Sequence, residues 1–129
     1  MRKITRKGLV RKLDKIVGEL VKMRDLKCVC CGSTTNLQPG HLFSRVAYST
    51  RWDLNNVFCQ CQSCNFKHEM DPYPLTNYYI KKFGKKAYDS LHRKYVTPVK
   101  YKDFQLQELY DELESYLGYD LSVANEGTQ

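Results

Sequence analysis

Two Cys-x-x-Cys pairs limit the possible folds of this chain more than any other feature. The first pair is Cys28 and Cys31, and the second is Cys61 and Cys64. Each pair can bind one metal ion from a tight turn, and two pairs complete a tetrahedral site of four thiolates, the usual structural zinc site. Because 29 residues separate the pairs, there is room for a strand, a loop and a return strand. We therefore predict a zinc ion (Zn) that joins the two ends of a hairpin.

Two of the six cysteines, Cys30 and Cys59, lie outside these pairs. The two-residue spacing gives a better chelating turn on both sides, so we expect the spare thiols to pack inside the fold or to lie at its surface. The sequence contains no signal peptide that we recognise, and in a reducing cytoplasm cysteines indicate metal rather than disulfides. A redox dithiol is the alternative interpretation of one pair, although a second pair would then be redundant.

Length and charge indicate a small nucleic-acid-binding protein. A chain of 129 residues fits one domain, and so small a core benefits from a metal. No apolar run approaches the ~18 residues that a spanning helix needs, so we expect no membrane partner. The net charge is +7, with nine Lys or Arg in residues 1–24 but seven acids and no base in residues 103–129. A positively charged protein of this kind can bind a polyanion such as nucleic acid, although the charge could instead serve only to keep the protein soluble.

Hydrophobic periodicity divides the chain into four parts. Residues 1–26 carry a basic amphipathic helix, expected at 6–24, whose apolar stripe should cover the core. Residues 27–72 form the zinc-stabilised core, with a strand at 37–43, a polar loop at 44–53 and a short helix at 64–70. Residues 73–119 are helical, with helices expected at 75–83, 85–95 and 104–117, and we expect residues 120–129 to be a disordered tail.

A histidine and an asparagine lie between the two cysteine pairs. Hydrolysis of a phosphodiester needs a base for the attacking water and positive charge for the leaving oxygen, and a histidine and a divalent cation can supply these. His41 would be carried by an element that the zinc makes rigid, which suits a catalytic base. Asn56, five residues before Cys61, could bridge the loop and fix the backbone or the ring of the histidine element.

The order Cys-x-x-Cys, Gly-His, Asn-x-x-x-x-Cys-x-x-Cys-Asn resembles the HNH endonucleases, and within them the NinG or Rap recombination nucleases of lambdoid phages. The resemblance covers about residues 28–95. It implies an α+β fold, a zinc-pinned ββα-metal (HNH) core with flanking α-helices. It also implies a catalytic Mg or Mn ion, a branched DNA substrate such as a Holliday junction or D-loop, a homodimer, and a location in the bacterial host cytoplasm.

The resemblance also assigns roles to individual residues. It implies His41 as general base, Asn56 as the middle asparagine of the motif, and Asn65 as the third motif residue, facing the cation. His68 competes with Asn65, because it lies about one helical turn further on and could share its face. The DNA-binding residues would be Arg45, Arg51 and Lys67.

One position departs from the wider HNH family, in which many members place an acid immediately before the base as a metal ligand. Here that position is Gly40. Asp53 is the first substitute ligand to consider, although it could equally cap the loop that contains Asn56. Glu69 and Asp71 are further candidates, and Gln38 could contribute a neutral oxygen.

The resulting hypothesis is metal-dependent hydrolysis of DNA, with a non-catalytic zinc module that binds nucleic acid or protein as its rival. The amphipathic segment 104–117 is either a dimer surface or a cover for the core of its own chain. The acidic residues 103–129 could mimic DNA or dock on the basic first helix. Deleting them would then tighten DNA binding at low salt.

Overall fold

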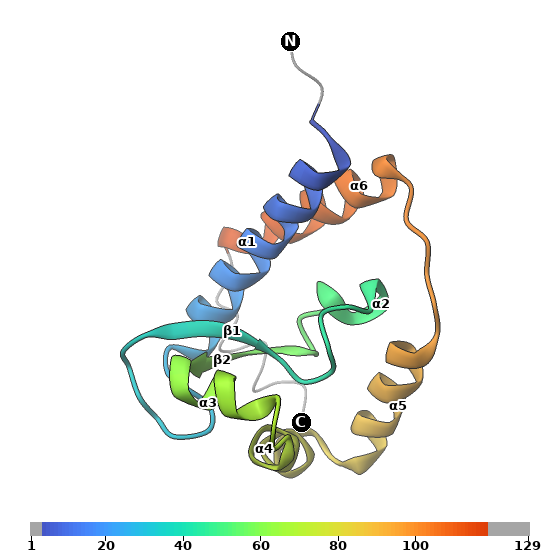
Figure 1. Cartoon of the computed structure of the whole chain (residues 1–129). Coiled ribbons are helices and arrows are strands. Elements are labelled where there is room, and N and C mark those ends of the chain that lie inside the picture. Colours follow the sequence, from blue (N-terminus) through green and yellow to red (C-terminus); the bar gives the residue numbers. More distant parts are fainter. Residues whose placement is uncertain (1–3, 119–129) are drawn as a thin grey trace.

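The computed structural model describes residues 4–118 (Figure 1), and the tail expected at 120–129 lies outside them. The elements in chain order are α1 (Arg6–Asp25), β1 (Leu37–His41), α2 (Tyr48–Arg51), β2 (Val57–Cys61), α3 (Gln62–His68), α4 (Tyr73–Phe83), α5 (Lys85–Val96), α6 (Asp103–Glu114) and the 3₁₀ helix η1 (Ser115–Gly118). The protein is therefore α+β, mostly helical with one two-stranded sheet. The prediction that 44–53 is only a loop was wrong, because α2 lies within it.

The first helix, α1, buries the apolar stripe that its sequence predicts. Its N-cap residue Thr5 accepts a hydrogen bond from the backbone N–H of Gly8, which satisfies one of the free donors at the helix start. The helix ends at Leu26, which adopts a left-handed conformation with a φ of 67°. The buried side of α1 consists of Leu9, Leu13, Ile16, Val17, Leu20 and Val21. The expected covering role of this helix is thus confirmed.

The sheet is an antiparallel hairpin in which β1 pairs with β2, Leu37 opposite Cys61 and His41 opposite Val57. Every residue of β2 is buried, because helices cover both of its faces. Since side chains alternate along a strand, Val57 and Cys59 face one side and Phe58 faces the other. This places His41 on the face that turns toward α1.

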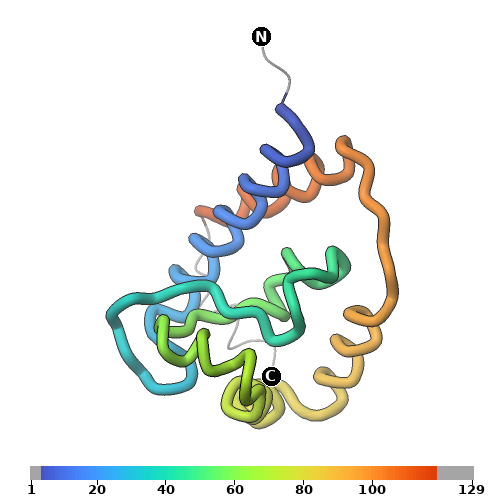
Figure 2. Tube along the Cα trace, viewed as in Figure 1, coloured from blue at the N-terminus to red at the C-terminus, as the bar shows by residue number. Residues whose placement is uncertain are grey.

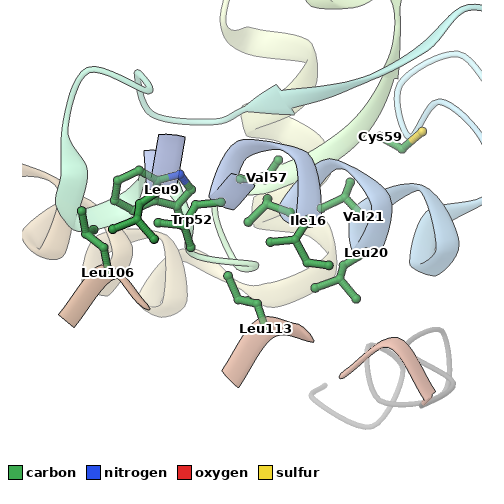
Figure 3. Packing of buried hydrophobic residues seen from close by; sticks show 11 residues of the cluster. Leu9, Ile16, Leu20, Val21, Trp52, Val57, Cys59, Leu106 and Leu113 are labelled. Carbon is green, nitrogen blue, oxygen red and sulfur yellow. The ribbon is translucent and has the colours of Figure 1, made fainter. Parts of the chain in front are cut away.

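The larger core lies between the hairpin, α1 and α6. Figure 3 shows Leu106 and Leu113 of α6 directed toward the apolar side chains of α1, with Trp52 at one end of the cluster and Cys59 at the other. Leu106 and Leu113 are buried, so α6 covers the core of its own chain. Of the two roles considered for this segment, the structure shows core packing.

A second core lies on the opposite face of the hairpin, where Phe58 meets α4 and α5. Its buried residues are Leu42, Phe58, Leu75, Tyr79 and Leu91. Phe58 contacts Tyr79 edge-on, with ring centroids 5.8 Å apart. In Figure 1, α3 and α4 lie below the hairpin and α1 above it, so the two strands form a middle layer.

Two charged residues at the end of α1 fix the position of β2. The Arg24 guanidinium donates to the carbonyl oxygens of Leu54 and Val57, at 2.8 and 2.7 Å, and pairs with Asp25. The Asp25 carboxylate in turn accepts from the backbone N–H of Cys59 at 2.9 Å. These contacts join the helix to the strand that leads into the second cysteine pair. Within residues 4–118, no helix is both long and apolar enough to cross a membrane.

Candidate functional site

Four cysteines converge where the loop after α1 meets the start of α3. The ligand atoms of Cys28, Cys31, Cys61 and Cys64 all lie within 4.8 Å of one another. Figure 2 shows the course of the chain that brings the cysteines together, with the loop between α1 and β1 beside the β2–α3 junction. The four thiols therefore form one compact cluster that could hold a zinc ion.

The spacing of the sulfurs fits zinc. Tetrahedral Zn–S bonds of about 2.3 Å place neighbouring sulfurs about 3.8 Å apart, and the Cys31 and Cys61 sulfurs are 3.7 Å apart. Gly32 closes the first turn with a φ of +82°, a left-handed conformation that glycine adopts without steric cost. In the second turn, the Cys64 N–H donates to the Cys61 sulfur at 3.4 Å. Backbone donors of this kind favour thiolates, the form that binds zinc.

The two remaining cysteines lie apart from this cluster. Cys59 is buried in the larger core, and Cys30 is half-buried and accepts a hydrogen bond from Gln60 at 3.5 Å. Burial raises the pKa of the Cys59 thiol to about 11, which keeps it protonated at neutral pH. Packing is thus the role of Cys59, as expected.

A cleft of about 580 Å³ adjoins the hairpin between α1 and α3. It brings together six of the residues singled out in the sequence, which are His41, Arg45, Arg51, Asn65, His68 and Glu69. These residues come from β1, from the loop after it, from α2, and from α3 and its C-cap. A concave site with a histidine and two arginines on one side and amide and imidazole groups on the other can accept a phosphate-bearing strand.

The His41 ring has a defined orientation in this cleft. Its Nε2 lies 2.9 Å from the backbone carbonyl oxygen of Arg51. Since a carbonyl oxygen only accepts, the neutral ring carries its proton on Nε2 and keeps Nδ1 as a base. Burial lowers the pKa of His41 below its usual value of 6.5, and the charge of Arg45 acts in the same direction. The imidazole is therefore neutral near pH 7, as a general base must be.

The two arginines of the cleft share one carboxylate, that of Asp14 on α1. Arg51 contacts it twice, at 3.0 and 2.7 Å, and Arg45 once, at 3.1 Å. The Trp52 indole N–H also donates to it at 2.9 Å. Although burial acts the other way, the hydrogen bonds from Arg51 and Trp52 hold the pKa of Asp14 below its usual value. The Arg45 side chain is 59% exposed and that of Arg51 is 14% exposed, so Arg45 is the more accessible cation.

Asn56 is fully buried and acts on the backbone. Its Oδ1 accepts from the N–H of Phe43 at 2.8 Å, and its Nδ2 donates to the carbonyls of Phe43 and Thr50 at 3.0 and 3.1 Å. The side chain thus joins the segment after β1 to α2 and β2. This is the bridging geometry considered for it from the sequence.

On α3, Asn65 and His68 line the cleft and Lys67 lies outside its lining, exposed at an adjoining pocket. The Asn65 Nδ2 donates to Gln38 at 3.0 Å, which leaves its amide oxygen as the atom able to contact a cation. The His68 Nε2 lies 3.1 Å from the carbonyl oxygen of Leu42. His68 therefore donates there, and its other ring nitrogen, Nδ1, is buried without a hydrogen-bond partner among the described residues.

The structure does not bring Asp53 to this cleft. Asp53 accepts from the backbone N–H of Asn55 at 2.9 Å and pairs with Lys94 at 2.6 Å, so it caps its loop, the alternative role. The acids that line the cleft are Asp14, which holds the arginines, and Glu69, which is exposed. Glu69 and the amide oxygen of Asn65 are thus the oxygen donors that suit Mg²⁺ or Mn²⁺ there.

Gly40, the residue before His41, leaves room for a side chain from the neighbouring strand. A Cβ at position 40 would lie 1.9 Å from the Gln60 Oε1. The buried Oε1 of Gln60 and Nδ1 of His68 have no hydrogen-bond partner among the described residues. Gln60 thus fills the space where an acid before the base would begin.

Sequence reasoning missed two residues of this region, Asp14 and Gln60. An acid within the strongly basic first helix was the available signal for Asp14, but nothing in the sequence relates it to an arginine 37 residues away. Gln60 carried no signal, because its contact with Gly40 depends on strand register.

A hairpin closed by four thiols, beside a cleft that contains a histidine and two arginines, defines a small α+β protein with a four-cysteine cluster that could bind zinc. The family described as Bacteriophage Lambda NinG protein matches residues 2–119 of the chain. The chain therefore belongs to the NinG family. No curated protein and no solved structure matches it.

Proposed function

We propose that this protein is a metal-dependent endonuclease of the HNH type that hydrolyses DNA phosphodiesters. The single observation that carries the proposal is the environment of His41. Its ring lies in a cleft with Arg45 and Arg51, its Nε2 proton is held by a backbone carbonyl, and its pKa is lowered. These properties leave Nδ1 able to take a proton from water at neutral pH.

In this mechanism each side chain has one task. His41 removes a proton from the attacking water, Arg45 binds a phosphate next to the cut, and the backbone carbonyl of Arg51 at the end of α2 orients the ring. Asn65 and Glu69 would hold Mg²⁺ or Mn²⁺, whereas the Nδ1 of His68 is buried and does not open onto the cleft. When bound, this cation supplies positive charge for the leaving 3′ oxygen. The four-cysteine zinc site keeps the ends of the hairpin together.

Membership of the Lambda NinG family supports a role in phage recombination, with branched intermediates such as Holliday junctions or D-loops as substrates. A basic chain with a net charge of +7 suits a substrate that presents several duplex arms. Its place of action would be the host cytoplasm. A homodimer would need a surface other than the buried side of α6, for instance the exposed apolar residues Phe66 and Met70 of the segment around α3.

The test is cleavage of a labelled four-way junction, a D-loop and a linear duplex with Mg²⁺ or Mn²⁺. We expect His41→Ala to bind the junction but to cut it at least about 100-fold more slowly, the usual contribution of a general base. The matched control is His92→Ala, since His92 lies on α5 outside the lining of the cleft. It should cut as the native protein does.

The rival is a zinc module that binds nucleic acid or protein without cutting. It predicts that both histidine variants bind the junction, and that neither they nor the native protein cut DNA when the metal is added. Equal cutting by the native protein and His41→Ala would indicate a contaminating nuclease or another base. Zinc content and melting temperature, measured on each preparation, establish that a loss of cutting is not a loss of fold.

A further inference from the structure

Asp14 is connected to His41 by an unbroken series of contacts. The Asp14 carboxylate receives two hydrogen bonds from the Arg51 guanidinium, at 3.0 and 2.7 Å. Arg51 is the last residue of α2, and its backbone carbonyl oxygen lies 2.9 Å from the Nε2 of His41. A side chain of the first helix thus contacts the residue whose backbone carbonyl is the hydrogen-bond partner of the imidazole.

The short helix α2 needs such an anchor. It has four residues and no side-chain N-cap, and a helix of one turn is not stable by itself. The last carbonyls of any helix lack partners within the helix, which leaves that of Arg51 able to accept from His41. Asp14 holds this end of α2 at two points, the guanidinium of Arg51 and the indole N–H of Trp52 at 2.9 Å.

The contact is also stronger than an ordinary surface ion pair. It involves two parallel hydrogen bonds between opposite charges, and the side chains of Arg51 and Asp14 are 14% and 30% exposed. By contrast, the ion pair between Arg6 and Asp103 is a single contact between side chains that are 44% and 62% exposed. Asp14 therefore restrains the Arg51 side chain, whereas Asp103 restrains the Arg6 side chain only weakly.

We propose that Asp14 is a positioning residue for His41: through the Arg51 side chain it fixes the backbone carbonyl that selects the Nε2-protonated tautomer of the imidazole. It does not touch the reacting atoms. With Asp14 in place, the Nδ1 of His41 stays unprotonated, and the contact between Nε2 and the Arg51 carbonyl fixes the orientation of the ring. The same carboxylate also holds Arg45 beside the ring, at 3.1 Å.

The tautomer can be read directly from ¹⁵N-labelled histidine by long-range ¹H–¹⁵N NMR at neutral pH. In the native protein we expect His41 to be almost entirely Nε2-protonated. In Asp14→Asn, whose amide cannot accept both Arg51 bonds, the ratio of the two tautomers should fall about tenfold, since a charge-assisted contact is lost. His68, whose Nε2 donates to Leu42, is the internal reference and should not change.

The matched control is Asp103→Asn, which removes one carboxylate charge from the exposed pair with Arg6. It should leave the His41 signals as they are in the native protein. A His41 tautomer ratio in Asp14→Asn equal to the native one, with zinc and melting temperature retained, would overturn the proposal. If Asp14→Asn does not fold, Arg51→Lys replaces it, because a lysine cannot make the two-point contact. An unchanged tautomer in that variant overturns the proposal equally.

This inference deepens the proposed function, because it rests on His41 as the base. In cleavage assays, Asp14→Asn should lower the single-turnover rate about tenfold and change KM less than about threefold. The two ideas fail separately. A protein that never cuts DNA but loses the His41 tautomer in Asp14→Asn retains the positioning role and loses the nuclease. A protein that cuts, with a tautomer and a rate insensitive to Asp14, retains the nuclease and loses the positioning role.

Discussion

If His41 is the base of the proposed nuclease, its lowered pKa determines the direction of a pH effect. Burial lowers its pKa below 6.5, and the base works only when deprotonated. The single-turnover cleavage rate should therefore be at its plateau at pH 7 and fall on acidification, with a midpoint below 6.5. The profile should be measured with Mg²⁺ and with Mn²⁺.

The two metals serve as the control for that profile. A midpoint that belongs to His41 stays nearly constant between them, whereas one that belongs to metal-bound water moves with the metal. An acid limb centred above pH 6.5 would contradict the assignment of the base.

Asn56 offers a stability prediction that does not depend on activity. Asn56→Ala removes a buried amide that makes three hydrogen bonds to the backbone, so the part-buried N–H and C=O of Phe43 and the buried C=O of Thr50 lose their partner. We expect a loss of about 3 kcal/mol in the free energy of unfolding. The neighbouring Asn55 is exposed, so Asn55→Ala should cost less than about 0.5 kcal/mol. Urea unfolding of the zinc-loaded proteins measures both values, and equal values would remove the bridging role.

These residues differ in how far the sequence identifies them. The four cysteines are recognisable because a chelating turn requires a short, fixed spacing. His41 is recognisable because it lies between those turns. The carboxylate of Asp14 belongs to a contact across 37 residues of chain, and no local pattern encodes such a contact. Asp53 was a reasonable ligand by type, but its loop directs it to Lys94.

The four-cysteine turns lead to a prediction about zinc. Cys31 belongs to the cluster and its neighbour Cys30 does not. If the cluster binds zinc, Cys31→Ser should lose most of the metal, and its melting temperature should fall markedly because the metal would join the two ends of the hairpin. Cys30→Ser should keep one zinc per chain. Zinc released into a colorimetric chelator after denaturation measures the difference, and loss from the Cys30 variant alone would show that the ligand assignment is shifted by one residue.

The first helix, and even the short helix expected at 64–70, which corresponds to α3, were predictable from the sequence, whereas α2 was not. The first helix was expected at 6–24 and spans Arg6–Asp25, because a repeated apolar spacing over twenty residues has few alternatives. The helix α2 lies in a polar segment with no apolar repeat. Its stability comes from Asp14 and Asn56, which contact it from other elements, so its own sequence carries little signal.

In the whole molecule, the basic first helix and the acidic last helix pack together. Figure 1 shows α1 and α6 side by side, and Lys12 lies 4.2 Å from the centre of the Tyr110 ring. The contact is mainly apolar, through Leu106 and Leu113. Deleting residues 103–129 would therefore expose the larger core. It would not isolate the effect of the acidic charges on DNA binding.

Charge neutralisation on the exposed side of α6 separates these effects. Glu108, Asp111 and Glu114 are exposed, so Glu108→Gln, Asp111→Asn and Glu114→Gln together should change the melting temperature little while they raise the net charge by three units. If the acidic helix repels DNA, the junction affinity should rise about threefold to tenfold at 20 mM salt, and the gain should disappear near 200 mM because counterions screen it. Leu106→Ala is the contrasting variant, since it keeps every charge and removes a buried side chain, at a cost of about 2–5 kcal/mol. Fluorescence anisotropy with a labelled four-way junction measures the affinities. Equal affinities of the neutralised and native proteins at low salt would mean that the acids of α6 do not affect DNA binding.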